Sequence, residues 1–209
     1  MKKIIELNTY KRLDHFNHFR SYSYQSVGVT VDVDVTSLIE FCKENSYSFY
    51  LLFIHCVALA ADEVPELRQR IIDNQIVEYD ECPTSHIELL NDSTYCYCTL
   101  HHHMPLNEYI EIANKTRQLA TCKASIIEDD EKDSFYFITC LPWFKYSQFI
   151  QPTGEETNPM ICWGKYELDF KNRYMLPVTI QANHALVDGI HLGMFYENLN
   201  KQINSIMIK

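Results

Sequence analysis

The segment from Val178 to His191 constrains the fold most, because it combines a strand, a turn and the beginning of a helix. Its first part alternates apolar and polar residues, which is the period of a half-buried strand. Asp188-Gly189 interrupts the alternation, and apolar residues then recur at helical spacing at Leu192, Phe195, Leu199 and Ile203. We therefore expect His184 just past the carboxyl end of a strand, four residues before an aspartate.

His184 is a candidate general base, because the imidazole is the side chain most easily held neutral near pH 7. The pattern H-x-x-x-D-G is weak by itself, since the chain contains nine histidines. A purely structural histidine remains the alternative interpretation at this point.

Size and composition predict a single globular domain over residues 1–209. Hydrophobic residues make up 46% and charged residues 22%, which is ordinary for a soluble protein. The formal net charge of −10 argues against a nucleic-acid surface and against acidic membranes. No stretch approaches the 18 or so apolar residues of a transmembrane helix.

The cysteines and the N-terminus favour the cytoplasm. The eight cysteines are scattered, several lie in apolar runs, and none forms a C-x-x-C pair, so we expect reduced thiols. Residues 1–6 lack the apolar core of a signal peptide.

The expected elements alternate strands with a few helices. Strands are predicted over 27–35, 75–78, 85–90, 95–100, 135–141, 160–166 and 175–182, and helices after an N-cap at Thr36, over 48–62, over 106–121 and from Ile190. The fold class is therefore α/β (α+β), a two-layer sandwich with helices packed on a mixed β-sheet. Its exposed edge strands favour an oligomer.

Five motifs in this order resemble the chloramphenicol acetyltransferase family of the trimeric, acetyl-CoA-dependent type, and the resemblance covers nearly the whole chain. In the family the motifs read R-K-E-H-F, L-D-I-T, P-E-F-R, S-x-x-P-W and H-H-A-V-C-D-G. The matching segments are Arg12–Phe16, Val33–Thr36, Pro65–Arg68, Thr139–Trp143 and Asn183–Gly189.

The resemblance implies a role for each residue of the catalytic centre. His184 would be the general base, and Thr139 would donate to the oxyanion in place of the family's serine. Asp188 would form an ion pair with Arg12 that holds the histidine turn. The acetyl group would pass directly from acetyl-CoA to a hydroxyl through one tetrahedral intermediate, because the chain has no G-x-S-x-G elbow or catalytic-cysteine context.

The resemblance also implies binding residues. Lys165, Tyr166 and Trp143 would lie against coenzyme A, although a solvated lysine and packed aromatics would explain the same residues. The acceptor pocket would include His18, Phe19, Ser23, Gln25, Val27 and Cys162. Ser23 and Gln25 make this pocket more polar than the family's, so the acceptor need not be chloramphenicol. A homotrimer with sites shared between subunits is implied.

The leading hypothesis is an acetyl-CoA-dependent O-acetyltransferase for chloramphenicol, an antibiotic-resistance activity, or for another small hydroxyl compound. One alternative is the core of a dihydrolipoamide acyltransferase. Another is a non-catalytic trimeric protein that binds a small molecule or coenzyme A.

No metal is expected. The run His101-His102-His103 is the one candidate, but adjacent residues of an extended segment point to opposite faces. No acidic or cysteine partner lies at ligand spacing in the sequence.

Overall fold

A computed structural model describes residues 1–127, 132–152, 154 and 156–206. The helices are α1 (Leu13–Arg20), α2 (Thr36–Asn45), α3 (Phe49–Asp62), α4 (Leu106–Lys123) and α5 (Gly189–Ile206). The strands are β1 (Lys2–Ile5), β2 (Ser26–Asp34), β3 (Gln69–Ile72), β4 (Gln75–Tyr79), β5 (Thr84–Leu89), β6 (Tyr95–Leu100), β7 (Tyr136–Cys140), β8 (Met160–Trp163), β9 (Glu167–Leu168) and β10 (Tyr174–Asn183).

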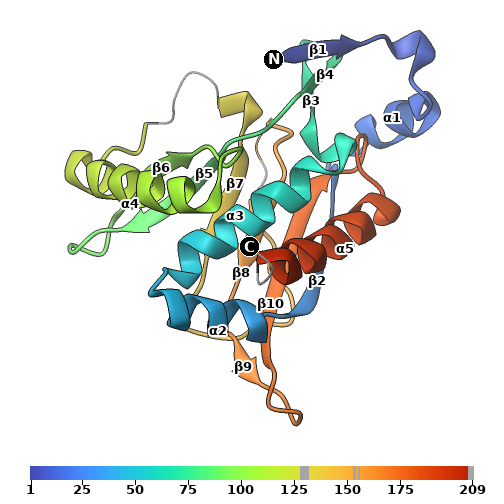
Figure 1. Ribbon diagram of the computed structural model, residues 1–209. Coiled ribbons are helices and arrows are strands. Elements are labelled where there is room, and N and C mark those ends of the chain that lie inside the picture. The colour runs from blue at the N-terminus through green and yellow to red at the C-terminus, as the bar shows by residue number, and fades with distance from the viewer. Residues whose placement is uncertain (128–131, 153, 155, 207–209) are drawn as a thin grey trace.

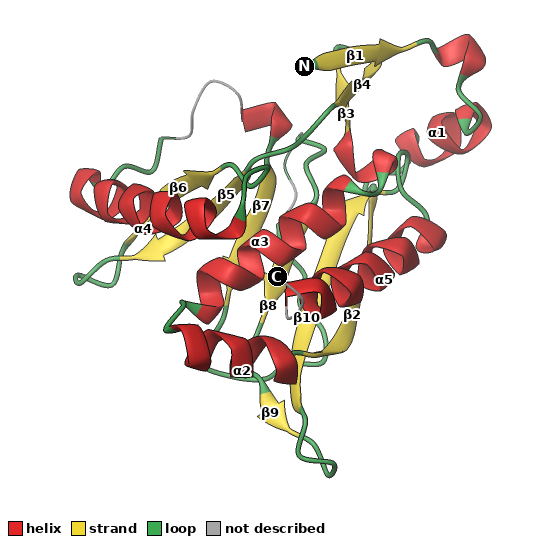
Figure 2. Ribbon diagram, viewed as in Figure 1, coloured by secondary structure: helices red, strands yellow, loops and turns green. Residues whose placement is uncertain are grey.

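The described strands form one large mixed sheet and one small antiparallel sheet (Figure 2). The large sheet has the order β2-β10-β8-β7-β5-β6, with β9 beside β10. Strand β10 runs antiparallel to both neighbours, whereas β8, β7 and β5 run parallel to one another. Helices α2 to α5 cover one face of this sheet (Figure 1). The expected two-layer α+β architecture is confirmed.

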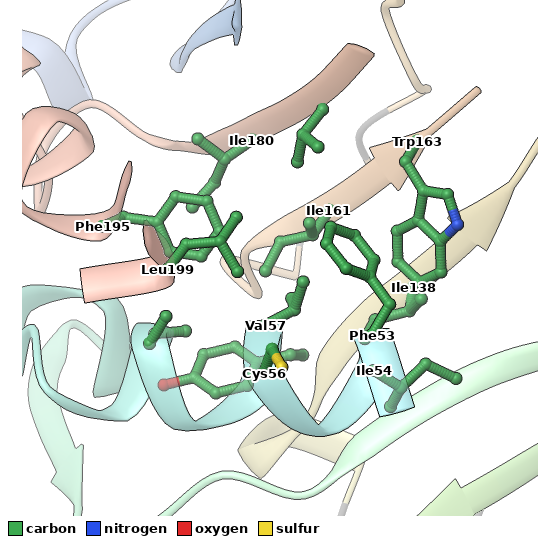
Figure 3. Close-up of a cluster of buried hydrophobic side chains, with 14 of the residues drawn as sticks. Phe53, Ile54, Cys56, Val57, Ile138, Ile161, Trp163, Ile180, Phe195 and Leu199 are labelled. Carbon is green, nitrogen blue, oxygen red and sulfur yellow. The ribbon is translucent and has the colours of Figure 1, made fainter. Parts of the chain in front are cut away.

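The core lies between these helices and the central strands (Figure 3). Helix α3 is apolar on nearly all sides and is buried along most of its length, as its sequence predicts. Its Phe53 packs edge-on against Trp163 of β8, with ring centroids 4.9 Å apart. Ile138, Ile161 and Ile180 face the helices from β7, β8 and β10 (Figure 3). Because side chains alternate along a strand, Thr139 faces away from the helices.

Several predicted boundaries were wrong for local reasons. The strand expected over 160–166 ends at Trp163. Thr36 is the first residue of α2 and not its N-cap, which is Val35, and the Asp34 carboxylate accepts hydrogen bonds from the Thr36 amide and hydroxyl. Strand β3 was missed because Arg70 interrupts its apolar pattern. This arginine is buried because its guanidinium donates to backbone carbonyl oxygens.

The alternating valines of β2 are only partly buried. Val33 is buried, as the alternation predicts, but Val29 and Val31 are 41% and 38% exposed in the single chain. The physical reason is that β2 is the edge strand of the sheet, where the helical layer ends. This leaves an apolar stripe at the edge of the sheet.

Two further observations concern the chain as a whole. All eight cysteines are unpaired, and only Cys122 is exposed. Among the described residues, no helix combines the length and apolar character needed to cross a membrane.

The packing of Phe53 predicts the cost of removing it. Phe53→Ala should lower the free energy of unfolding by about 3–5 kcal/mol, because it leaves a cavity against Trp163. Urea denaturation measures this loss, with the exposed Leu119→Ala of α4 as the control, expected to lie within about 0.5 kcal/mol of wild type. Equal losses in the two variants would contradict a core centred on Phe53.

Candidate active site

His184 lies in the turn directly after β10, held in one tautomer. Its Nδ1 is 3.0 Å from the carbonyl oxygen of Val187 and 3.2 Å from Oδ1 of Asp188. Both oxygens can only accept a hydrogen bond while Asp188 is ionised, so Nδ1 carries the proton and donates. The lone pair of the neutral ring is therefore on Nε2, where a general base needs it.

The surroundings of His184 fix the plane of its ring. The imidazole stacks on Phe19 of α1, with ring centroids 3.6 Å apart and an angle of 10° between planes. The His184 amide donates to the carbonyl oxygen of Gln25 at 2.6 Å. Phe19 therefore packs directly against the proposed base, while His18 is exposed and bonds Tyr22 at 2.9 Å.

Asp188 connects this turn to α1. Its carboxylate accepts a hydrogen bond from Arg12, the residue that precedes α1, and its backbone amide donates to Nδ1 of His191 at 2.9 Å. The hydrogen bond from Arg12 lowers the pKa of Asp188, which outweighs the rise caused by burial. Asp188 is thus ionised at neutral pH, and the expected Arg12–Asp188 pair is present in the structure.

Thr139 lies on the opposite face of the sheet from the helices. It pairs with Cys162 in the register of β7 and β8, and its hydroxyl donates to Oε1 of Gln151 at 3.3 Å. Cys162 is fully buried. Burial raises the pKa of Cys162 to about 11 and that of Cys140 to about 12. Neither thiol is a nucleophilic thiolate at neutral pH.

Thr139 lines two adjoining cavities. The Thr139 cavity, of about 750 Å³, also contains Gln151 and Met160 in its wall. The tryptophan cavity, of about 620 Å³, is lined by Trp143, Lys165 and Tyr166 among others. The structure thus brings together the predicted oxyanion donor and the predicted coenzyme A residues. Tyr166 also packs edge-on against Phe49 of α3 at 5.7 Å.

A third cavity continues from the Thr139 cavity, because Met160 and Glu156 line both. This Gln25 cavity, of about 510 Å³, is lined by Ser23 and Gln25. Its other walls are mostly polar, formed among others by Arg20, Asp73, Asn74, Thr157, Asn158 and Gln181. The three cavities adjoin one another through these shared residues and through Thr139, and together they are called the groove below. Val27 instead packs against the core from β2.

Within one chain, His184 and Thr139 do not meet. Thr139 of β7 pairs with Cys162 of β8, and Cys162 pairs with Thr179 of β10, two strands from Thr139. His184 is five residues beyond Thr179 along the chain. At the usual rise per residue and spacing between strands, the Cα atoms of His184 and Thr139 lie roughly 19 Å apart. Asn183 lines the Gln25 cavity, but among the described residues His184 lines none of the three.

Sequence reasoning missed two glutamines that organise the groove. The backbone amide of Gln151 donates to the side chain of Gln181, and the Gln181 amide donates back to the Gln151 carbonyl oxygen, each at 3.2 Å. This pair fixes the segment that presents Gln151 to Thr139. Gln151 belongs to a polar stretch that reads as an ordinary loop, so the sequence carried no signal for it.

The argument against the histidine run was also wrong. His102 and His103 both contact Asp62, an acidic partner that lies 40 residues away in the sequence. Adjacent histidines converge here because residues 101–103 form an irregular connection and not a strand.

Comparison with known proteins shows the family of this chain. The sequence model described as chloramphenicol acetyltransferase matches residues 2–200. The chain belongs to the chloramphenicol acetyltransferase family. Among its curated relatives, the chloramphenicol acetyltransferase of Proteus mirabilis is 26% identical and covers 95% of this chain and 93% of its own length. Chloramphenicol acetyltransferase 2 of Escherichia coli is also 26% identical, with 97% of each chain covered.

Solved structures share the fold. A chloramphenicol acetyltransferase superposes with a TM-score of 0.85 at 21% identity, covering 97% of this chain and 100% of the other. The dihydrolipoamide acetyltransferase of Azotobacter vinelandii gives a TM-score of 0.71 at 14% identity, covering 93% and 87%. The protein is therefore an acyltransferase, in a chloramphenicol acetyltransferase family whose co-substrate is acetyl-CoA.

The Arg12–Asp188 pair predicts a pH-dependent stability. The pKa of Asp188 is lowered in the folded state, so its carboxylate stabilises the fold above its ordinary pKa of about 3.9. This contribution is lost as the pH falls through the lowered pKa. Asp188→Asn should cost on the order of 1–3 kcal/mol at pH 7, and the difference from wild type should shrink below about pH 4.

Urea denaturation at a series of pH values measures this difference. Glu44→Gln, an exposed change in α2, is the control and should show little effect. A cost of Asp188→Asn that stays constant from neutral to acidic pH would mean that the ion pair is not its source.

Proposed function

We propose that this protein is an acetyl-CoA-dependent O-acetyltransferase that acetylates a hydroxyl of chloramphenicol or of a related small molecule. The observation that carries the proposal is the hydrogen bond from Nδ1 of His184 to the Val187 carbonyl oxygen at 3.0 Å. It leaves the lone pair of a neutral imidazole on Nε2, in a ring held by Phe19. Family membership supplies the acyl-transfer chemistry that such a base can assist.

The proposed reaction proceeds by direct transfer. Nε2 of His184 takes the proton from the acceptor hydroxyl as its oxygen attacks the thioester carbonyl carbon. The Thr139 hydroxyl donates to the oxyanion of the tetrahedral intermediate. The carbon–sulfur bond then breaks, and the departing thiolate takes the proton back from His184, which yields the acetyl ester and free coenzyme A. The protonated thiols of Cys140 and Cys162 support a route without an acyl-enzyme.

Coenzyme A fits the tryptophan cavity by its chemistry. Trp143 and Tyr166 offer aromatic surface for the adenine, and Lys165 offers a cation for phosphate. Thr139, which lines both this cavity and the Thr139 cavity, would then adjoin the thioester. The acceptor would occupy the groove on the other side of Thr139.

The acceptor groove favours a polar compound. Gln151 contacts Thr139, and Ser23, Gln25 and Arg20 line the continuation of the groove. Polar groups in a binding site must be paired by the ligand, so an acceptor with several hydroxyl or amide groups suits this groove better than a mainly aromatic one.

A homotrimer with shared sites would complete the active centre. His184 and Thr139 lie roughly 19 Å apart within one chain, which is too far for both to contact one reacting group. A second copy that brings its His184 to the Thr139 groove resolves this separation. The apolar stripe of Val29 and Val31 on the edge strand supports burial against such a copy.

The unpaired cysteines support a reducing compartment for this enzyme, which we propose is the cytoplasm. Seven of the eight thiols are at least partly buried and none is cross-linked. Proteins that work in oxidising compartments usually pair such residues.

The proposed role of His184 as general base predicts that His184→Ala loses turnover. The rate of free-thiol release from acetyl-CoA should fall by about 10²–10⁴-fold, because proton transfer to Nε2 is removed. The assay compares chloramphenicol, other small polyhydroxyl acceptors and dihydrolipoamide, with the exposed His101→Ala as the control. Turnover of chloramphenicol would make this an antibiotic-resistance enzyme, and turnover of dihydrolipoamide alone would contradict the proposed acceptor. Unchanged turnover in His184→Ala would contradict the proposed base.

Shared sites predict complementation between two inactive variants. Thr139→Val removes the oxyanion donor and should lower kcat by about 10²–10³-fold, while Thr139→Ser should keep most of the activity. When His184→Ala and Thr139→Val chains are refolded together in equal amounts, about a quarter of the interfaces would join an intact His184 to an intact Thr139. Activity near that fraction of wild type is expected. No recovery in mixed trimers would show that each chain uses its own pair.

A further inference from the structure

A cluster of metal-binding side chains lies outside the proposed active site. Asp62 ends α3, and His102 and His103 lie in the connection between β6 and α4. The Nε2 atoms of His102 and His103 are 2.8 and 2.7 Å from the same oxygen, Oδ2 of Asp62. The three donor atoms all lie within 4.8 Å of one another. None of these residues lines the Thr139, tryptophan or Gln25 cavity.

The Asp62 carboxylate is oriented by its other oxygen. Oδ1 accepts a hydrogen bond from the Tyr136 hydroxyl at 2.8 Å and another from the Cys82 amide at 3.2 Å. These two donors come from β7 and from the segment before β5, so they fix the carboxylate plane from outside the cluster. Oδ2 is thereby directed at the two imidazoles. Metal-binding carboxylates are commonly held by such outer hydrogen bonds.

The side chains of the cluster differ in how deeply they are buried. The side chains of Asp62 and His102 are 6% and 2% exposed, whereas that of His103 is 44% exposed. Glu81 is half exposed, and its Oε2 is 3.7 Å from Nε2 of His103. An ion would therefore have two buried ligands, one half-exposed histidine at the surface, and a half-exposed carboxylate beside that histidine.

We propose that Asp62, His102 and His103 bind a divalent transition-metal ion of the zinc class, with Glu81 as the fourth ligand. Two neutral imidazoles and two carboxylates form a nitrogen–oxygen ligand set that suits Zn²⁺. The two carboxylate charges also balance the charge of the ion.

Small side-chain movements would give these residues the geometry of a tetrahedral metal site. A tetrahedral ion with ligands at about 2.0–2.1 Å separates neighbouring donor atoms by about 3.3 Å. The nitrogen–oxygen distances in the cluster would then open by roughly half an ångström. His103 is exposed enough to make most of this movement by side-chain rotation, while Asp62 and His102 stay in place.

The ion would have a structural role. It would connect the C-terminal end of α3 with the β6–α4 connection and, through Glu81, with the segment that leads into β5. Strands β5 and β6 lie at the edge of the large sheet farthest from β2. Because an ion that binds only the folded chain stabilises it by mass action, loading the site should raise the melting temperature.

The test uses the full-length chain without a histidine tag, stripped of metal with a chelator. Co²⁺ is titrated in and followed by its visible absorption, and Zn²⁺ is then added as a competitor. His103→Ala removes a ligand at a half-exposed position and should leave the fold intact. His101→Ala is the matched control, an exposed histidine of the same tripeptide outside the cluster.

Wild type and His101→Ala should each bind one Co²⁺ per chain with the intense visible bands of a tetrahedral site, displaced by Zn²⁺. His103→Ala should bind at least tenfold more weakly. Zn²⁺ at about a hundredfold excess over Kd should raise the melting temperature of wild type by about 5 °C and that of His103→Ala by much less.

Three results would overturn the proposal. They are the absence of Co²⁺ binding by wild type, equal affinity in wild type and His103→Ala, and thiolate-to-cobalt charge-transfer bands, which would place the ion on cysteines. The first would show that the cluster is held by hydrogen bonds alone.

Discussion

The pairing of β10 on both of its edges determines where the two proposed catalytic groups of this protein, His184 and Thr139, lie. Antiparallel ladders to β2 and β8 hold β10 in the sheet and fix its register. His184 follows the last paired residue, so its position is set by the end of the ladder. The same register, through β8, fixes the level of Thr139 on β7. One set of backbone hydrogen bonds therefore places both groups, and places them far apart.

The two faces of the sheet have different surroundings because side chains alternate along each strand. One face carries Ile138, Ile161 and Ile180 against the helices and forms the core (Figure 3). The other face carries Thr139 and Gln181 and is covered by the segment that contains Gln151. The groove that we assign to coenzyme A and the acceptor thus lies on strands whose other face is buried in the hydrophobic core.

The sequence predicted most elements whose side chains follow a clear period. Helix α3 and strands β6 and β10 lie close to their expected bounds because their apolar patterns are local. Strand β3 was missed because buried Arg70 is stabilised by carbonyl oxygens from distant residues. In the candidate site, the motifs predicted Arg12, Thr139, His184 and Asp188, and the structure contains the Arg12–Asp188 pair, but the contact of Thr139 with Gln151 depends on how a loop folds back over the sheet.

The sequence by itself determined the family, the fold class and the identity of the candidate base, because these are carried by short motifs and by local periodicity. Only the tertiary structure decided which groups share a space. It separated His184 from Thr139 within one chain and placed Thr139 in the wall of the same cavity as Trp143 and Lys165. It also brought Asp62 into contact with two histidines about forty positions away in the sequence. The physical reason is that strand register and helix packing act between segments distant in sequence, and no local pattern encodes their distances.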